Sequence, residues 1–183
     1  MENQRQVLVP VAQGIEEMEA ITIIDVLRRA GARVTVASVD RRRIQAARGI
    51  VFEADCLISQ CLDRDFDLIA LPGGLPGAEN LAASPELADL LKKQAGRQAL
   101  YGGICASPAL VLHPLGLVRE GAVTCHPGFA HFIGETSGER VSRDGCCITS
   151  RGGGTSLDFA LALVELLFPQ DTLDEVRAGL ALG

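Results

Sequence analysis

Cys105 is the residue of this chain whose type and position point most directly to chemistry. Residues 99–104 read as an apolar strand, and a helix is expected after the cysteine, with Pro108 in its first turn, where the missing N–H costs nothing. A nucleophile on such a sharp turn is held exposed, as in the elbow of hydrolases. The free N–H groups of the helix would favour thiolate over thiol, so we expect a lowered pKa. The alternative is a buried, inert cysteine.

Glu19 is the carboxyl expected beside this sulfur. It stands in the run Glu16, Glu17, Met18, Glu19 at the start of a predicted helix. Acids at a helix N-terminus can serve as caps, and that reading fits Glu16 and Glu17. Glu19 instead lies close to the apolar positions of the helix. A carboxyl next to a thiolate would have a raised pKa and would donate a hydrogen bond to the sulfur.

Backbone donors are expected from the loop at Gly73 and Gly74, which follows the strand 66–71. Glycines let backbone N–H groups approach a ligand closely. Together with the Ala106 N–H they would stabilise an oxyanion beside Cys105. The alternative reading of the two glycines is a plain turn.

His126 is the best histidine candidate for a base near Cys105, because it follows a short apolar segment expected to be a strand, 122–125. His113 and His131 read as structural and surface residues. The chain has no His-x-Glu pair, which argues against the triad of a glutamine amidotransferase.

The remaining cysteines read as packing residues, with no CxxC spacing and only weak support for a metal site. Cys146 and Cys147 are adjacent in a strand-like run, so their side chains are expected on opposite faces. The other three are Cys56, Cys61 and Cys125. We therefore expect no metal and no cofactor.

Composition narrows the class of protein. The chain has 183 residues, which predicts one domain, residues 1–183. A net charge of −6 without a basic stripe argues against nucleic-acid binding. No apolar run reaches membrane-spanning length, and the polar first residues lack the pattern of a secretory signal. We therefore expect a cytoplasmic protein with reduced thiols and no membrane partner.

Strand-like and helix-like segments alternate along the chain. Strands are expected at 6–12, 33–39, 66–71, 98–104, 122–125 and 146–149, with a hairpin arm at 50–52. Helices are expected at 15–30, 84–94, 156–167 and 173–182. This order predicts an α/β fold with a parallel sheet covered on both faces. The notable residues fall in loops at the carboxyl ends of its strands, where such sheets form their sites.

These segments together resemble the ThiJ/PfpI superfamily, in the branch of the Parkinsonism-associated protein deglycase and bacterial YajL. The matching runs span almost the whole chain: 14–20, 25–31, 71–81, 104–109, 124–127 and 149–156. The run 152–155, read alone, is a tight strand-to-helix connection that lacks the lysine of a phosphate-binding loop.

The resemblance implies a flavodoxin-like three-layer sandwich and a homodimer with the first helix at its interface. It assigns Cys105 as nucleophile and redox-sensitive thiol, Glu19 as its hydrogen-bonding carboxyl and His126 as the nearby histidine. Gly74 and Ala106 supply backbone N–H groups. Arg29 and Arg48 match arginines that approach the site at the interface. The surplus apolar residues of the first helix, Ile15, Met18, Ile21 and Ile24, agree with pairing there.

One departure selects the branch, because family peptidases carry a histidine directly after the nucleophile and this chain has Ala106. The expected function is a cofactor-independent cysteine enzyme of glyoxalase or protein deglycase type. It would convert methylglyoxal or glyoxal, or their adducts on proteins, to lactate or glycolate. The alternative is an oxidative-stress sensor or chaperone whose Cys105 oxidises to sulfinate.

Overall fold

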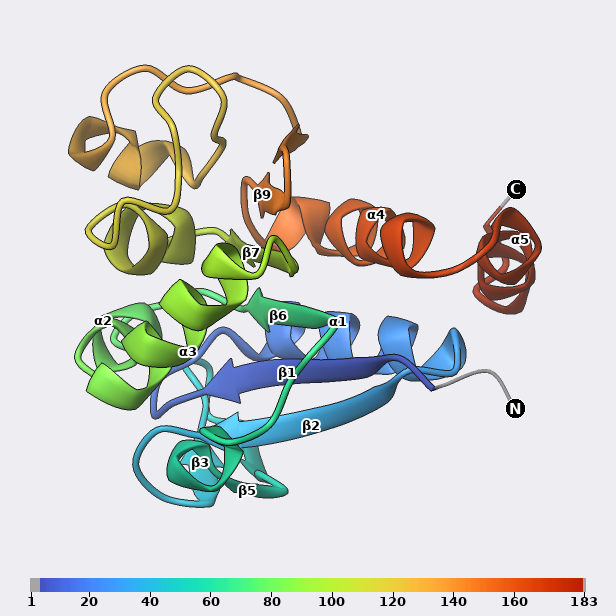
Figure 1. Cartoon of the computed structure of the whole chain (residues 1–183), viewed down its shortest axis with the longest axis horizontal. Helices are drawn as coiled ribbons and strands as arrows, with labels where there is room; N and C mark the ends of the chain where they lie inside the picture. The colour runs from blue at the N-terminus through green and yellow to red at the C-terminus, as the bar shows by residue number, and fades with distance from the viewer. Residues whose placement is uncertain (1–3, 183) are drawn as a thin grey trace.

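A seven-stranded sheet forms the centre of the computed structural model, which describes residues 4–182 (Figure 1). The strand order is β5-β2-β1-β6-β7-β9-β8. Strand β8 runs antiparallel to β9, and the other neighbouring pairs are parallel. In chain order the strands are β1 (Gln6–Val11), β2 (Arg33–Ser38), β5 (Cys56–Leu57), β6 (Leu68–Leu71), β7 (Leu100–Ile104), β8 (Val141–Asp144) and β9 (Cys147–Ser150).

The central strands are continuous apolar runs rather than alternating ones. In β1 the residues from Val7 to Val11 are buried, and β6 is buried throughout. A strand covered on both faces needs apolar side chains on both, which removes the period of two. The expected parallel sheet is therefore confirmed.

Helices cover both faces of this sheet (Figure 1). Helices α1 (Glu17–Arg29) and α4 (Ser156–Leu167) pack against each other, and α5 (Gln170–Gly179) packs on α4. Helices α2 (Gly77–Ala82) and α3 (Pro85–Gly96) contact β1 and β7 respectively. The five strands β2-β1-β6-β7-β9 follow the flavodoxin-like order, so the expected three-layer fold is confirmed.

Short elements connect the layers. A two-stranded hairpin, β3 (Arg43–Gln45) with β4 (Val51–Glu53), contains the expected arm. Short helical turns lie at η1 (Ile58–Cys61), η2 (Pro108–Leu112), η3 (Pro127–Phe132) and η4 (Gly153–Thr155). The last of these is the connection expected between β9 and α4.

Three sequence-based expectations about local structure are wrong. The helix expected after Cys105 is only the five-residue turn η2. Residues 122–125 form no strand, because Thr124 is held by side-chain bonds instead of a ladder: its N–H donates to Thr149 Oγ1 and its hydroxyl to Glu139 O. Helix α1 also begins at Glu17 instead of residue 15, which leaves Ile15 fully buried below it.

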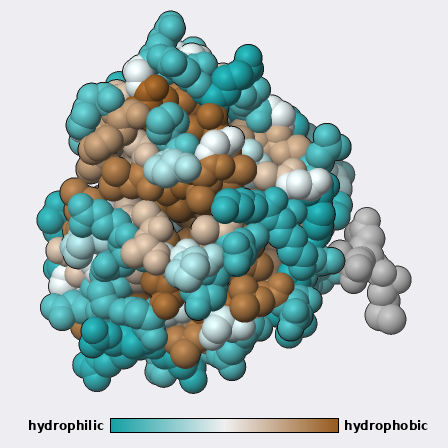
Figure 2. Space-filling view, turned by 60° about the vertical axis from the view of Figure 1, so that its left-hand side comes forward, coloured by the Kyte–Doolittle hydropathy of each residue, from teal (hydrophilic) through white to brown (hydrophobic). Residues whose placement is uncertain are grey.

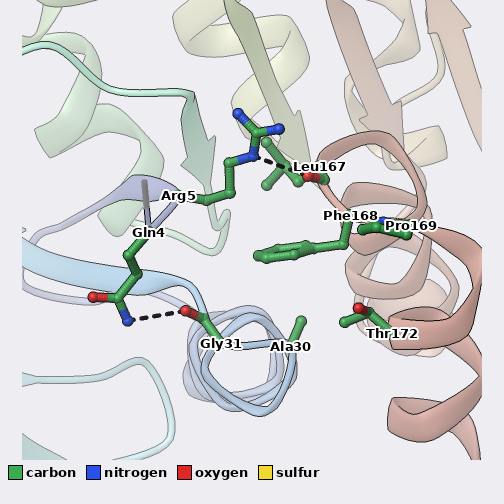
Figure 3. A pocket seen from close by; sticks show the side chains of 8 residues that line it. All are labelled: Gln4, Arg5, Ala30, Gly31, Leu167, Phe168, Pro169 and Thr172. Atoms are coloured by element: carbon green, nitrogen blue, oxygen red, sulfur yellow. Dashed lines mark hydrogen bonds between the residues drawn. The ribbon is translucent and has the colours of Figure 1, made fainter. Parts of the chain in front are cut away.

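A cavity of about 610 Å³ lies at the amino ends of the strands, away from the loop of Cys105 (Figure 3). Its wall residues are bonded to one another: Arg5 Nε donates to Leu167 O at 3.1 Å, and Gln4 Nε2 donates to Gly31 O at 3.0 Å. These bonds tie the segment before β1 to the ends of α1 and α4. None of the described helices is long and apolar enough to cross a membrane.

Candidate active site

Cys105 sits on a strained turn at the carboxyl end of β7. Its φ is +64°, a left-handed conformation that is costly for a residue with a Cβ. Two backbone bonds hold it there: the Cys105 N–H donates to Ser150 O at 3.0 Å, and the His126 N–H donates to Cys105 O at 2.9 Å. The structure therefore has the elbow geometry expected from the sequence.

The loop after β6 closes over the sulfur. The backbone N–H groups of Gly74 and Ala106 approach Cys105 and act to lower the pKa of its thiol. Gly73 allows this approach, because a Cβ on it would lie 2.7 Å from the Cβ of Cys105. The Ser107 hydroxyl also donates to Pro72 O at 2.5 Å, which fixes the elbow to the loop.

Glu19 reaches the same point from helix α1. Its side chain is fully buried, and Oε2 accepts the Gly73 N–H at 2.8 Å. The carboxyl is also within hydrogen-bonding reach of the Cys105 thiol. Its second oxygen, Oε1, is buried and has no other partner of good geometry in the described part of the chain. The Gly73 N–H thus positions Glu19, while Gly74 and Ala106 direct theirs at the sulfur.

Burial controls the protonation of this pair. It raises the pKa of Glu19 to about 7, against the lowering effect of the Gly73 hydrogen bond. Burial also raises the pKa of the Cys105 thiol to about 12, with the neighbouring charge of Glu19 as the second cause. The expected lowering of the Cys105 pKa is therefore wrong. The five-residue turn η2 supplies only a small dipole, and the two N–H donors do not offset the loss of water.

The pair accordingly releases its first proton near neutral pH. Loss of that proton leaves a carboxylate next to a thiol, and a thiolate next to a carboxylic acid then forms by a proton transfer within the pair. A base with a pKa near 7 beside a nucleophile is well matched to catalysis in neutral solution.

The sulfur opens into a cleft of about 470 Å³. Met18, Leu75 and Phe129 form apolar walls, and Arg48 and His126 add polar groups. A molecule of a few heavy atoms fits this space, and the opening leaves room for an adduct carried on a larger chain. Leu75 and Phe129 are not predicted as site residues from the sequence, although both lie within three residues of predicted ones, Gly74 and His126.

His126 lies beside the sulfur without bonding to it. A Cβ on Gly152 would lie 3.8 Å from Cys105 Sγ and 3.4 Å from His126 Cδ2, so both side chains border one point of the cleft. The Nδ1 atom of His126 accepts the Gly128 N–H at 3.1 Å. In the neutral ring the proton is then on Nε2, which makes His126 a donor rather than a base.

The two candidate arginines are placed differently. Arg48 borders the cleft, and its backbone N–H donates to the buried carboxylate of Glu17 at 2.9 Å. Arg29 is paired with Asp25 on its own helix at 2.6 Å and does not line the cleft. Among the described residues, no three His, Cys, Asp or Glu side chains come together as a metal site.

Several known proteins are similar in sequence to this chain over most of its length. Protein DJ-1 homolog B of Arabidopsis thaliana is 47% identical over 93% of the chain, but the match covers 40% of that protein, so the chain spans less than half of its length. The Parkinson disease protein 7 homolog of Danio rerio is 40% identical, with 97% of both chains covered. The glutathione-independent glyoxalase DJR-1.2 of Caenorhabditis elegans is 36% identical over 83% of this chain and 82% of its own.

Solved structures with the same fold are also known. The structure of oxidized Toxoplasma gondii DJ-1 superposes with a TM-score of 0.93 at 40% identity, covering 97% of this chain and 98% of the other. The family model described as the DJ-1/PfpI family matches residues 5–166. With most of its length matched by that model and by full-length relatives, the chain belongs to the DJ-1/PfpI family.

Proposed function

We propose that this protein is a cofactor-independent cysteine enzyme that acts on reactive carbonyls. Its substrates are methylglyoxal and glyoxal, or the early adducts that they leave on proteins, and its products are lactate and glycolate. The observation that carries the proposal is the buried Cys105–Glu19 pair, with a carboxyl whose pKa is about 7 next to the sulfur.

The first step forms a carbon–sulfur bond. Cys105 Sγ attacks the aldehyde carbon of methylglyoxal, and Glu19 accepts the thiol proton as the bond forms. The aldehyde oxygen then takes up this proton from Glu19, which gives a hemithioacetal on Cys105 and restores the carboxylate. The Gly74 and Ala106 N–H groups stabilise negative charge on the sulfur as the thiol proton leaves it.

The second step is an isomerisation without net oxidation. Glu19 removes the proton from the former aldehyde carbon and returns it to the neighbouring ketone carbon, through an enediol. The Nε2–H of His126 is placed at the cleft to bind the ketone oxygen. The product is a hydroxyacyl thioester, and water then releases lactate and restores the thiol. Methylglyoxal and one water thus give one lactate.

A relative supports this reaction class. The Caenorhabditis elegans protein with 36% identity is named a glutathione-independent glyoxalase. In a reaction that needs no glutathione, a thiol of the protein itself can take the place of the glutathione thiol, and Cys105 borders the cleft.

A second candidate function is an oxidative-stress sensor. Gly74, Ala106 and protonated Glu19 offer three hydrogen-bond donors around one sulfur, which suits the oxygens of a sulfinate. The Toxoplasma gondii relative is described in an oxidized form. In this reading Cys105 is oxidised by peroxide, and turnover of carbonyls is incidental.

We also propose that two copies pair through α1. Met18 and Ile21 of this helix are 57% and 47% exposed, and Ile24 is partly buried. Ile15 adds nothing to that surface, because it is fully buried. On the face of the molecule seen in Figure 2, apolar surface gathers in patches between polar groups. Burial of such side chains stabilises association.

Light scattering at micromolar concentration tests the pairing. The wild-type protein and Leu62→Glu, which changes an exposed apolar residue after η1, are expected to be dimers. Met18→Glu is expected to shift the mass toward that of a monomer. A wild-type monomer contradicts the pairing.

Lactate formation from methylglyoxal tests the proposed enzyme. Cys105→Ser is expected to form lactate no faster than the uncatalysed reaction, since a hydroxyl is a much weaker nucleophile than a thiol. The matched control is Cys146→Ser, which alters a half-buried thiol that donates to Gln98 O at 3.0 Å. Turnover by Cys105→Ser at the wild-type rate would remove the cysteine mechanism.

A further inference from the structure

Apart from the Cys105 site, a pair of sulfurs lies at the far edge of the sheet. Cys56 is in β5, the edge strand next to β2 (Figure 1), and Cys61 ends the turn η1. Their Sγ atoms are 3.6 Å apart, and both are free thiols. Cys61 is fully buried, whereas Cys56 keeps part of its surface in solvent.

The local chain holds the two sulfurs together. The Leu57 N–H donates to Gln60 Oε1 at 3.0 Å, which closes η1 back onto β5. A disulfide has an S–S distance of about 2.05 Å, so the sulfurs need to approach by only about 1.5 Å.

We propose that Cys56 and Cys61 form a reversible disulfide, a redox site of this chain separate from Cys105. The oxidant is a hydroperoxide. The Cys56 thiolate attacks its outer oxygen, the O–O bond breaks, and the products are a sulfenic acid on Cys56 and an alcohol, or water from hydrogen peroxide. Cys61 then attacks the Cys56 sulfur, and water leaves as the disulfide forms. Two thiols lose two electrons, and the peroxide gains them.

The two cysteines divide these roles by exposure. Cys56 is the one that peroxide can reach, and Cys61 is the buried thiol that resolves the sulfenic acid. Burial raises the pKa of Cys61 to about 11, which the hydrogen bond and charge of Arg64 partly offset. Arg64 is held in place by a bond from its Nη2 to Thr35 Oγ1 at 3.0 Å and by the ring of Phe66.

Cys105, Cys146 and Cys147 are not placed to replace either partner. Cys105 follows β7, four strand spacings from β5, or about 19 Å across the sheet. Cys146 and Cys147 are adjacent, but Cys146 Sγ donates to Gln98 O while Cys147 is buried beside Tyr101. The proposed disulfide is therefore specific to the edge of the sheet.

Peptide mass spectrometry after a hydrogen peroxide titration tests this proposal on the wild-type protein. Free thiols are alkylated and the chain is cut with trypsin, which places Cys56 and Cys61 alone together in residues 49–64. That peptide is expected to lose two hydrogen masses and to escape alkylation, and dithiothreitol is expected to reverse both changes. Residues 144–151, which hold Cys146 and Cys147, are the internal control and are expected to stay alkylated.

Single variants separate a disulfide from independent oxidation. In Cys61→Ala the sulfenic acid on Cys56 has no resolving thiol, so a dione reagent for sulfenic acids is expected to label residues 49–64. In Cys56→Ser the buried Cys61 is expected to remain a thiol at the same dose. The proposal is overturned if wild-type residues 49–64 stay fully alkylated at the dose that oxidises Cys105, or if they gain oxygen without forming a disulfide.

Discussion

The two sulfur sites of this protein differ in what lies next to the thiol. Cys105 has a buried carboxyl and two backbone donors beside it, whereas Cys56 has a second thiol at 3.6 Å. A carboxyl accepts a proton and leaves the sulfur free to attack carbon. A second thiol instead resolves an oxidised sulfur as a disulfide. The neighbour, more than the cysteine itself, therefore determines the chemistry.

The two sites also differ in the backbone that holds each cysteine. Cys105 is held in a left-handed conformation at the carboxyl end of a central strand, where loops from β1, β6 and β7 meet. Cys56 belongs to a two-residue edge strand without a cleft of comparable size among the described residues. Strain and a cleft belong to the site that we propose binds a substrate, and neither is needed for a disulfide.

Removing the Glu19 carboxyl should have the largest effect on methylglyoxal turnover, and it tests whether this neighbour determines the chemistry of Cys105. Glu19→Gln is expected to lower kcat/KM for methylglyoxal by about 10²–10⁴, since glutamine keeps a hydrogen bond to the sulfur but cannot exchange a proton. Peroxide oxidation of Cys105 is expected to survive in the same variant. The matched control is Glu17→Gln, which changes a buried carboxyl of α1 that binds the Arg48 N–H instead of the sulfur.

Both quantities can be measured on one preparation of each variant, as lactate release and as the mass of residues 98–119. Turnover of Glu19→Gln near the wild-type level would remove Glu19 from the catalytic mechanism and favour the sensor reading. Equal losses in Glu17→Gln would point to a structural effect.

The same substitution should change stability in a pH-dependent way. The pKa of Glu19 is raised from 4.5 to about 7 in the folded state, so that state binds the proton more strongly than the unfolded chain. Wild-type stability attributable to this group is therefore full below pH 4.5 and is lost as the pH rises toward 7. Between pH 5 and pH 8 the unfolding free energy of the wild-type protein should fall by about 2–3 kcal/mol because of this group, and Glu19→Gln should not show that fall. Urea unfolding at both pH values measures this, and an identical difference at both would contradict the buried charge.

Substitutions of Cys56 and Cys61 should have the smallest effect on methylglyoxal turnover. Cys56→Ser and Cys61→Ala are expected to leave methylglyoxal turnover within about twofold of wild type, because distant sites contribute independently. A large loss of turnover in either variant, with the protein still folded, would show that the two sulfur sites are coupled.

The turn at Cys105 and the parallel sheet could be predicted from the sequence, because the signals for both are local. The turn at Cys105 is signalled by an apolar run that stops at the cysteine and by Pro108. The alternation of strands and helices likewise predicts the sheet, and its loops identify the edge where Glu19 and Cys105 meet. Periodicity and turn residues carry this kind of information.

Other features depend on contacts between distant segments. The raised pKa of Cys105 follows from burial under the β6 loop, which no local pattern near the cysteine reports. The segment 122–125 has the apolar composition of a strand, but Thr124 bonds to the side chain of Thr149 in β9 and to the backbone carbonyl of Glu139 in the loop before β8. The approach of Cys56 to Cys61 depends on how η1 folds back onto β5, so their spacing alone reads as packing.

The pH dependence of kcat/KM for methylglyoxal tests the central claim most directly, because it reports the proton that Cys105 and Glu19 share. The rate constant is expected to rise about tenfold per pH unit below pH 7 and to level off above it, with the transition near the Glu19 pKa of about 7. Glu19→Gln is expected to lose that transition. A wild-type profile that is flat from acid to alkaline pH, or that keeps rising toward the pKa of an isolated thiol, would contradict the account.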